Sequence, residues 1–208
     1  MTESKSRLAG AGKVLLRAAA LAAMVASLQG CIGLAVGGAV MGTLAATDRR
    51  TFGAQADDKE IAVRAEARIK NIFGENAHVN VNSFNRKVLL TGEARDAATK
   101  AQIEREVAAI QGVASVANEL EIAELSTYTQ RSNDTLITTK IKASFVDQKD
   151  LSVNVLKVVT ERGVVYLMGR VTTSEGTLAG EVASGVSGVR KVVKLFEYIN
   201  QDEFSRRS

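Results

Sequence analysis

The sequence predicts an α+β protein built from two similar domains, each with the element order helix, strand, strand, helix, strand. The chain repeats itself, because several short segments recur at a spacing of 76 or 77 residues. A fixed repeat of this kind predicts repeated structural units. Within each unit the apolar residues change from helical spacing to alternation and back to helical spacing. We therefore expect two helices packed on one face of a three-stranded mixed sheet in each domain.

The repeat rests on motifs that occupy corresponding places in the two units. One motif is an apolar run that ends in glycine, another is a Gly-Val-x-x-Val segment, and the third is an aspartate followed three residues later by isoleucine. The matching pairs are Gly92 with Gly169, Gly112 with Gly188, Asp58 with Asp134, and Ile61 with Ile137. Each unit is about 67 residues long, which is enough for a small independent core.

The first unit, residues 57–123, follows this order element by element. Ile61, Ala65, Ile69 and Ile72 recur at helical spacing. Alternating strands around residues 79–81 and 88–90 flank a turn at Asn85-Arg86-Lys87. A helix over 96–110 with Asp96 as its cap and a strand over 113–122 complete the unit.

The second unit, residues 132–199, repeats the pattern after a linker at 124–131 and ends before a tail at 200–208. Its first helix carries Ile137, Ile141 and Phe145 on one face. Strands at 153–158 and 164–167 flank the turn Glu161-Arg162-Gly163. The helix over 173–186 contains Gly176 and Gly180, so it is expected to be less regular. A strand over 189–199 closes the unit.

Residues 1–30 read as a secretion signal, with a basic flank followed by an apolar run from Ala18 to Leu28. The next residues, Leu28-Gln29-Gly30-Cys31, resemble the lipobox of bacterial lipoproteins, although Gln29 departs from the usual small residue. The resemblance implies a diacylglyceryl group on the thiol of Cys31, a third acyl chain (palmitate is one such chain) on its amine, and no other cofactor. The alternative is an uncleaved membrane anchor that continues to Ala46, but glycines interrupt that continuation.

Cys31 is followed by Ile32 rather than aspartate, and among bacterial lipoproteins this favours the outer membrane over inner-membrane retention. Residues 31–56 begin Gly/Ala-rich and end polar, so we expect a flexible tether between the lipid and the first domain.

Composition excludes several classes of function. Without residues 1–30 the chain has 23 basic and 22 acidic residues, which is not the balance of a nucleic-acid-binding protein. One cysteine and one histidine cannot form a His/Cys metal cluster. His78 is expected to be a surface or edge residue, and Asp57-Asp58 to cap the first helix. No phosphate-binding loop or nucleophile elbow is present, so we expect no enzymatic activity.

The doubled αββαβ order, with the Leu-x-Gly strand ends and Gly-Val-x-x-Val segments, resembles the BON domain. Two such units behind a lipobox look like the dual-BON-domain lipoproteins of the Gram-negative outer membrane, and residues 133–140 are especially similar to their second domain. The resemblance implies a non-enzymatic protein on the periplasmic face that binds anionic phospholipid and maintains membrane integrity. It also suggests the outer-membrane assembly machinery as a partner and enrichment at the division site. We expect a monomer.

The charge of the two units favours the second as the membrane-binding one. Its net charge is +2, against −2 for the first unit, and basic residues are attracted to anionic lipid. On its first helix, several residues point away from the expected core at 100° per residue. The phospholipid-binding candidates are Thr135, Leu136, Thr139, Lys140, Lys142, Ala143 and Val146.

Other interpretations of the same residues remain open. Leu136 and Val146 could instead pack on the neighbouring domain, since two domains joined by a short linker should touch. The protein could also be a periplasmic protein-interaction or chaperone-like module that is merely tethered by its lipid. An ion- or small-ligand-binding role is a third alternative, with no coordinating cluster evident in the sequence.

Overall fold

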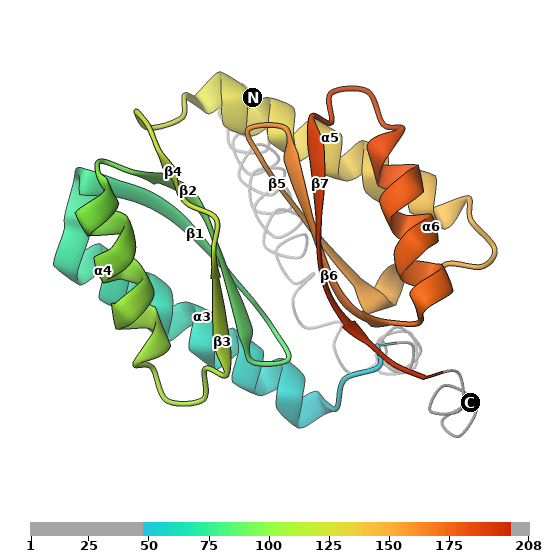
Figure 1. The fold of residues 1–208 in the computed structure, drawn as a ribbon, viewed down its shortest axis with the longest axis horizontal. Helices are drawn as coiled ribbons and strands as arrows, with labels where there is room; N and C mark the ends of the chain where they lie inside the picture. Colours follow the sequence, from blue (N-terminus) through green and yellow to red (C-terminus); the bar gives the residue numbers. More distant parts are fainter. Residues whose placement is uncertain (1–47, 201–208) are drawn as a thin grey trace, which may run out of the picture. The chain divides into compact units, whose positions relative to one another are not determined.

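The computed structural model describes residues 48–200. Cys31, the signal segment 1–30, most of the expected tether and the tail from residue 201 lie outside this range. The first unit contains α3 (Phe52–Phe73), β1 (Ala77–Phe84), β2 (Lys87–Ala94), α4 (Ala97–Ala108), β3 (Ser115–Asn118) and β4 (Glu121–Ile122). The second contains α5 (Tyr128–Val146), β5 (Leu156–Glu161), β6 (Val164–Val171), α6 (Thr173–Ser184) and β7 (Lys191–Tyr198). The predicted αββαβ order is confirmed in both units (Figure 1). Single 3₁₀ turns precede β1 (Gly74–Asn76) and β5 (Val153–Val155).

Each sheet is mixed, with its second strand in the centre. β1 pairs antiparallel with β2 through a two-residue turn at Asn85 and Arg86, which both have positive φ, as two-residue hairpin turns require. β2 then pairs parallel with β3 after the α4 crossover. The second sheet has the same order, β5-β6-β7, with β5 antiparallel and β7 parallel to β6.

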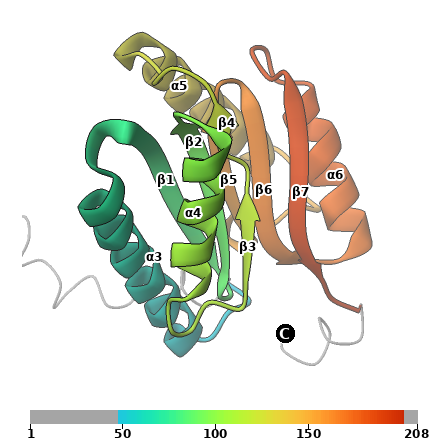
Figure 2. The same ribbon diagram turned by 60° about the vertical axis from the view of Figure 1, so that its left-hand side comes forward.

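Two helices cover one face of each sheet, as Figure 2 shows for α3 and α4 on the first sheet. The core of the first unit lies between these layers and includes Ile61, Ala65, Val88, Leu90 and Ile103. The core of the second unit is built from the corresponding residues, which include Ile137, Ile141, Phe145, Val165 and Leu167. The helical spacing in the sequence therefore identified the buried face of α5 and most of that of α3. The exception is Ile72, which is 46% exposed, because Phe73 lies four residues after Ile69 and takes the buried position.

A third apolar cluster joins the two units through the sheet faces that carry no helices. Phe84 and Leu89 of the first sheet pack with Tyr166 and Met168 of the second. Consequently β2 and β6 are buried on both faces along most of their length. The two units thus form four layers in the order helices, sheet, sheet, helices.

Helix starts differ from the sequence-based boundaries. α3 begins at Phe52, where Thr51 accepts a hydrogen bond from the Ala54 N–H at 3.1 Å. Arg49 also makes a bidentate ion pair with Glu175 on α6, with both N–O distances 2.7 Å. Residues 48–56 are therefore packed rather than part of a flexible tether, because they have a helix cap and a paired arginine that the composition of the segment does not reveal.

The linker is also shorter than expected. A capping box between Thr127 and Gln130 starts α5 at Tyr128, so residues 128–131 of the expected linker are helical.

Two further differences concern strands and glycines. The closing strand of the first unit is split into β3 and β4, so its sheet has four strands rather than three.

Helix α6 is continuous through Gly176 and Gly180. A Cβ at Gly176 would lie 3.0–3.1 Å from the rings of Tyr198 and Phe196, so this glycine lets the helix approach β7 closely.

Candidate functional site

Helix α5 carries the residues that the sequence singled out for membrane contact. Its buried face consists of Asp134, Ile137, Ile141 and Phe145. These side chains fix the rotation of the helix on its sheet, so the opposite face is presented outward. None of the described helices is long and apolar enough to cross a membrane.

All seven candidates on α5 are exposed. The side chains of Leu136 and Val146 are 60% and 69% exposed; the other five are Thr135, Thr139, Lys140, Lys142 and Ala143. The helical angles place Leu136 and Ala143 near the middle of the strip, while the two lysines flank it on opposite sides. Among residues 48–200, nothing covers Leu136 or Val146, so they do not pack on the first domain as the alternative interpretation required.

Two details of this face were not expected from the sequence. The hydroxyls of Thr135 and Thr139 donate to the carbonyls of Arg131 and Thr135 at 3.0 and 2.9 Å. Their protons are therefore used within the helix. Tyr128, which is 88% exposed, lies on the same side of the helix as Val146 at 100° per residue. Tyr128 was missed because the helix was expected to start after it.

The two aspartates of the repeat hold the hairpin turns. Asp134 accepts hydrogen bonds from the Arg162 and Gly163 N–H groups, each at 2.8 Å. Asp58 accepts from the Asn85 and Arg86 N–H groups at 2.7 and 2.8 Å. The expectation that Asp58 caps the first helix was wrong, since α3 begins six residues earlier. The 76-residue spacing of the two aspartates reflects a clamp from helix to turn in each domain.

His78 has partners that the sequence did not indicate. His78 and Glu93 face each other across β1 and β2, and Nδ1 of His78 lies 3.0 Å from Oε2 of Glu93. Glu93 is fully buried and also lies 3.4 Å from the Arg162 guanidinium of the second domain. His78 lies on the edge strand β1, as expected, but its pairing with Glu93 was not indicated because that partner lies 15 residues away in sequence.

The second domain adds a further carboxylate to this group. Asn80 donates to Oε2 of Glu161 at 2.7 Å. Burial raises the pKa of Glu161 above its ordinary value, and the neighbouring Glu93 carboxylate raises it further. The ligand atoms of His78, Glu93 and Glu161 lie within 4.8 Å of one another, and they are the group among residues 48–200 with spacing suitable for a metal ion. Every member already has a hydrogen-bonding or charged partner, so we interpret the group as a polar link between the domains.

Residues 48–200 therefore define a class of protein: a two-domain α+β protein with paired sheets and an exposed helix face that carries apolar and basic side chains. The BON domain family model matches residues 57–124 and 133–200. The chain therefore belongs to the BON domain family, in the group of dual-BON-domain lipoproteins.

Curated relatives agree with this assignment. The chain is 37% identical over 180 residues to "Outer membrane lipoprotein DolP" of Haemophilus influenzae, covering 83% of this chain and 91% of the relative. It is 34% identical over 158 residues to the "21 kDa hemolysin" of Actinobacillus pleuropneumoniae, covering 73% of this chain and 79% of the relative.

The solved structure of CdsD, a structural protein of the type III secretion system of Chlamydia trachomatis, is a distant match. Its TM-score is 0.30 at 12% identity, with 69% of this chain and 96% of that chain covered. A similarity this weak carries no argument about function.

Proposed function

We propose that this protein is an outer-membrane lipoprotein whose second BON domain binds anionic phospholipid, such as phosphatidylglycerol, on the periplasmic face. The lipid on Cys31 would anchor the chain, and the exposed face of α5 would contact the headgroup region. The observation that carries the proposal is the exposure of Leu136 and Val146 beside Lys140 and Lys142. The Haemophilus relative is an outer-membrane lipoprotein by name, which supports the outer-membrane location. Support of membrane integrity, contact with the assembly machinery and enrichment at the division site belong to the same proposal.

The membrane affinity expected for the exposed face of α5 is modest, which suits a protein that is already tethered by a lipid. Basic residues near an anionic surface contribute about 1 kcal/mol each, and fully burying a Leu or Val side chain contributes roughly 1.5–3 kcal/mol. Partial insertion of Leu136 and Val146 therefore gives only modest affinity by itself. The lipid anchor would keep the domain close to the membrane, so a weak second contact suffices to orient it.

The test is co-sedimentation of a fragment spanning residues 48–208 with vesicles that contain or lack phosphatidylglycerol. Residues 47–208 form one compact unit, so the fragment lacks only the anchor and tether. Changing Lys140→Glu and Lys142→Glu together should weaken binding to anionic vesicles by at least ~30-fold, from ~1 kcal/mol for each lost lysine. The matched control is Lys70→Glu with Lys191→Glu, two exposed lysines elsewhere on the unit. Equal binding by both double variants would contradict the assignment.

A protein-interaction role is the second candidate, and the same exposed apolar side chains favour it. Leu136→Ser with Val146→Ser separates the two functions. Reduced vesicle binding in this variant supports membrane contact. Unchanged vesicle binding together with lost retention of an unfolded client protein would support the protein-interaction role.

A further inference from the structure

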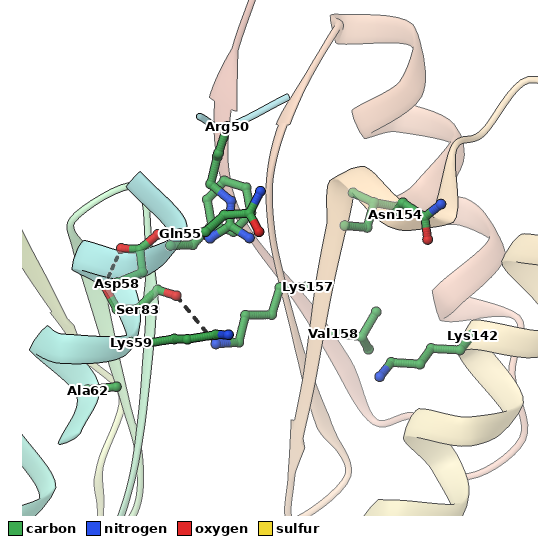
Figure 3. Close-up of a pocket in the computed structure, with 12 residues that line it drawn as sticks. Arg50, Gln55, Asp58, Lys59, Ala62, Ser83, Lys142, Asn154, Lys157 and Val158 are labelled. Atoms are coloured by element: carbon green, nitrogen blue, oxygen red, sulfur yellow. Dashed lines mark hydrogen bonds and ion pairs between the residues drawn. The ribbon is translucent and has the colours of Figure 1, made fainter. Parts of the chain in front are cut away.

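A hollow of about 340 Å³ lies between the two domains, bounded by α3, the end of β1, the start of β5 and one flank of α5 (Figure 3). This volume is at the lower end of the range of roughly 300–1,000 Å³ for small-molecule sites. Its charged and amide lining includes Arg50, Gln55, Asp58, Lys59, Lys142 and Lys157.

The hollow has an excess of positive charge that its own acid does not neutralise. Asp58 is the one carboxylate in the lining, and four donors already occupy its oxygens. They are Arg50 Nη1, Ser83 Oγ and the N–H groups of Asn85 and Arg86, at 2.6–2.8 Å. Arg50 is paired in turn with Asp48 and lies 4.0 Å over the ring of Phe84. Asp58 and Arg50 therefore neutralise each other, and no other carboxylate in the lining is available to pair with the lysines.

The three lysines come from three different elements. Lys59 lies on α3, Lys142 on α5 and Lys157 on β5. In Figure 3 the side chains of Lys59 and Lys157 point toward each other, whereas Lys142 lies on the other side of β5, beside Val158. None of the ion pairs found within residues 48–200 involves a lysine. An ammonium group has three donors, and Lys157 Nζ donates one long hydrogen bond of 3.3 Å to the Ser83 carbonyl.

The lowered pKa of Lys157 shows that its positive charge is destabilised in this structure, and a bound anion would stabilise it. Partial burial and the positive charges of Arg50 and Lys142 lower its pKa, and the carboxylates of Asp58 and Glu66 offset only part of this effect. A buried positive charge is costly unless a negative group pairs with it. Gln55 adds a second unmet donor, because its buried Nε2 has no partner among the described residues.

The remaining lining indicates the size and polarity of the ligand. Phe84, Leu156 and Val158 form an apolar wall beside the lysines. A compact anion with a small organic part would meet the ammonium groups and this wall together. Phosphate esters have this combination, and a phosphate offers several strong acceptor oxygens to convergent donors.

We propose that this interdomain hollow binds the phosphate group of a small ester, held by Lys59 and Lys157 with the amide of Gln55 beside them. The ligand could be the headgroup of an anionic phospholipid or a free phosphate compound, which share this chemistry. The suggestion that the ligand is a lipid headgroup rests on the function proposed above. Recognition of a phosphate group by the hollow does not depend on that function. Because the lysines belong to both domains, the ligand would also link the domains.

The experiment is isothermal titration of the 48–208 fragment in phosphate-free, low-salt buffer with two probes, inorganic phosphate and monomeric dihexanoyl phosphatidylglycerol. Dihexanoyl phosphatidylcholine serves as the zwitterionic control. The test variant is Lys59→Gln with Lys157→Gln, and the matched control is Lys149→Gln with Lys191→Gln, two exposed lysines outside both the hollow and the membrane-contacting face of α5. Thermal melts establish that both variants fold, and Lys59→Gln alone, at an exposed position, is the second variant.

We expect saturable binding that weakens at least tenfold in the test variant and stays unchanged in the control variant. Binding of phosphatidylglycerol assigns a lipid source, and binding of inorganic phosphate alone assigns a soluble one. No binding of either probe, or equal binding by both variants, overturns the proposal. Loss of vesicle sedimentation in the wild-type fragment would refute the function proposed above while leaving this site intact, so the two failures are distinguishable.

Discussion

Removing the Asp134 carboxylate tests whether a clamp from helix to turn holds α5 on its sheet. Asp134 is buried, and its carboxylate accepts hydrogen bonds from the Arg162 and Gly163 N–H groups at 2.8 Å. Hydrogen bonds to a charged group contribute about 1.5–3 kcal/mol each, and an unsatisfied buried donor costs about 1–3 kcal/mol. Asp134→Ala should therefore lower the free energy of unfolding by about 3–5 kcal/mol, a large part of the roughly 5–15 kcal/mol typical of native proteins.

The assay is urea unfolding of the 48–208 fragment, followed by circular dichroism. Asp134→Asn should fall between wild type and Asp134→Ala, because the amide keeps one acceptor oxygen for the two N–H groups. The matched control, Asp150→Ala, alters an exposed aspartate and should change stability by about 0.5 kcal/mol or less. A loss below ~1 kcal/mol in Asp134→Ala, set against the expected ~1.5–3 kcal/mol for each bond, would show that the turn does not depend on this carboxylate.

Two further predictions concern the first domain and the domain interface. Gly92→Ala should destabilise the protein by about 2–4 kcal/mol, because a Cβ there would lie 2.1 Å from the His78 carbonyl oxygen and φ is +114°; a thermal melt measures this, and an unchanged melting temperature would refute it. Burial raises the pKa of Glu161 in the folded state above its ordinary value of 4.5. Between pH 4.5 and this raised pKa, the folded state therefore binds more protons than the unfolded state. Stability should fall as pH rises through this window, and Glu161→Gln should flatten the pH profile; a profile equally steep in the variant would contradict the assignment to Glu161.

The repeated domain could be predicted from sequence because its signals are local. Helical spacing at Ile137, Ile141 and Phe145 marks the buried face of α5 directly. Asp96 was correctly identified as a helix cap, and it accepts from the Thr99 N–H at 2.7 Å. The missed helix starts at Thr51 and Thr127 had a readable signal too, since threonine is a favoured cap. The expected boundaries in these two segments, 48–56 and 124–131, followed their polar composition instead of these capping threonines.

Contacts between the domains were not predictable in the same way. Phe84 and Tyr166 lie on strands, where alternation shows that a residue faces outward from its own core but not what covers it. The apolar runs Val88-Leu89-Leu90 and 164–168 were a usable signal, because a strand buried on both faces is nearly continuous in apolar residues. The partners His78 and Glu161 come from separate domains, and no local spacing relates them.

The sequence by itself therefore determined the repeat, the αββαβ order and the outward face of α5. Each of these depends on short-range periodicity, or on a motif that is read along the chain. The tertiary structure decided which sheet faces meet, which acids surround His78, and which lysines line one hollow. Those arrangements depend on bringing together residues up to about a hundred positions apart, through burial that only the packed domains produce.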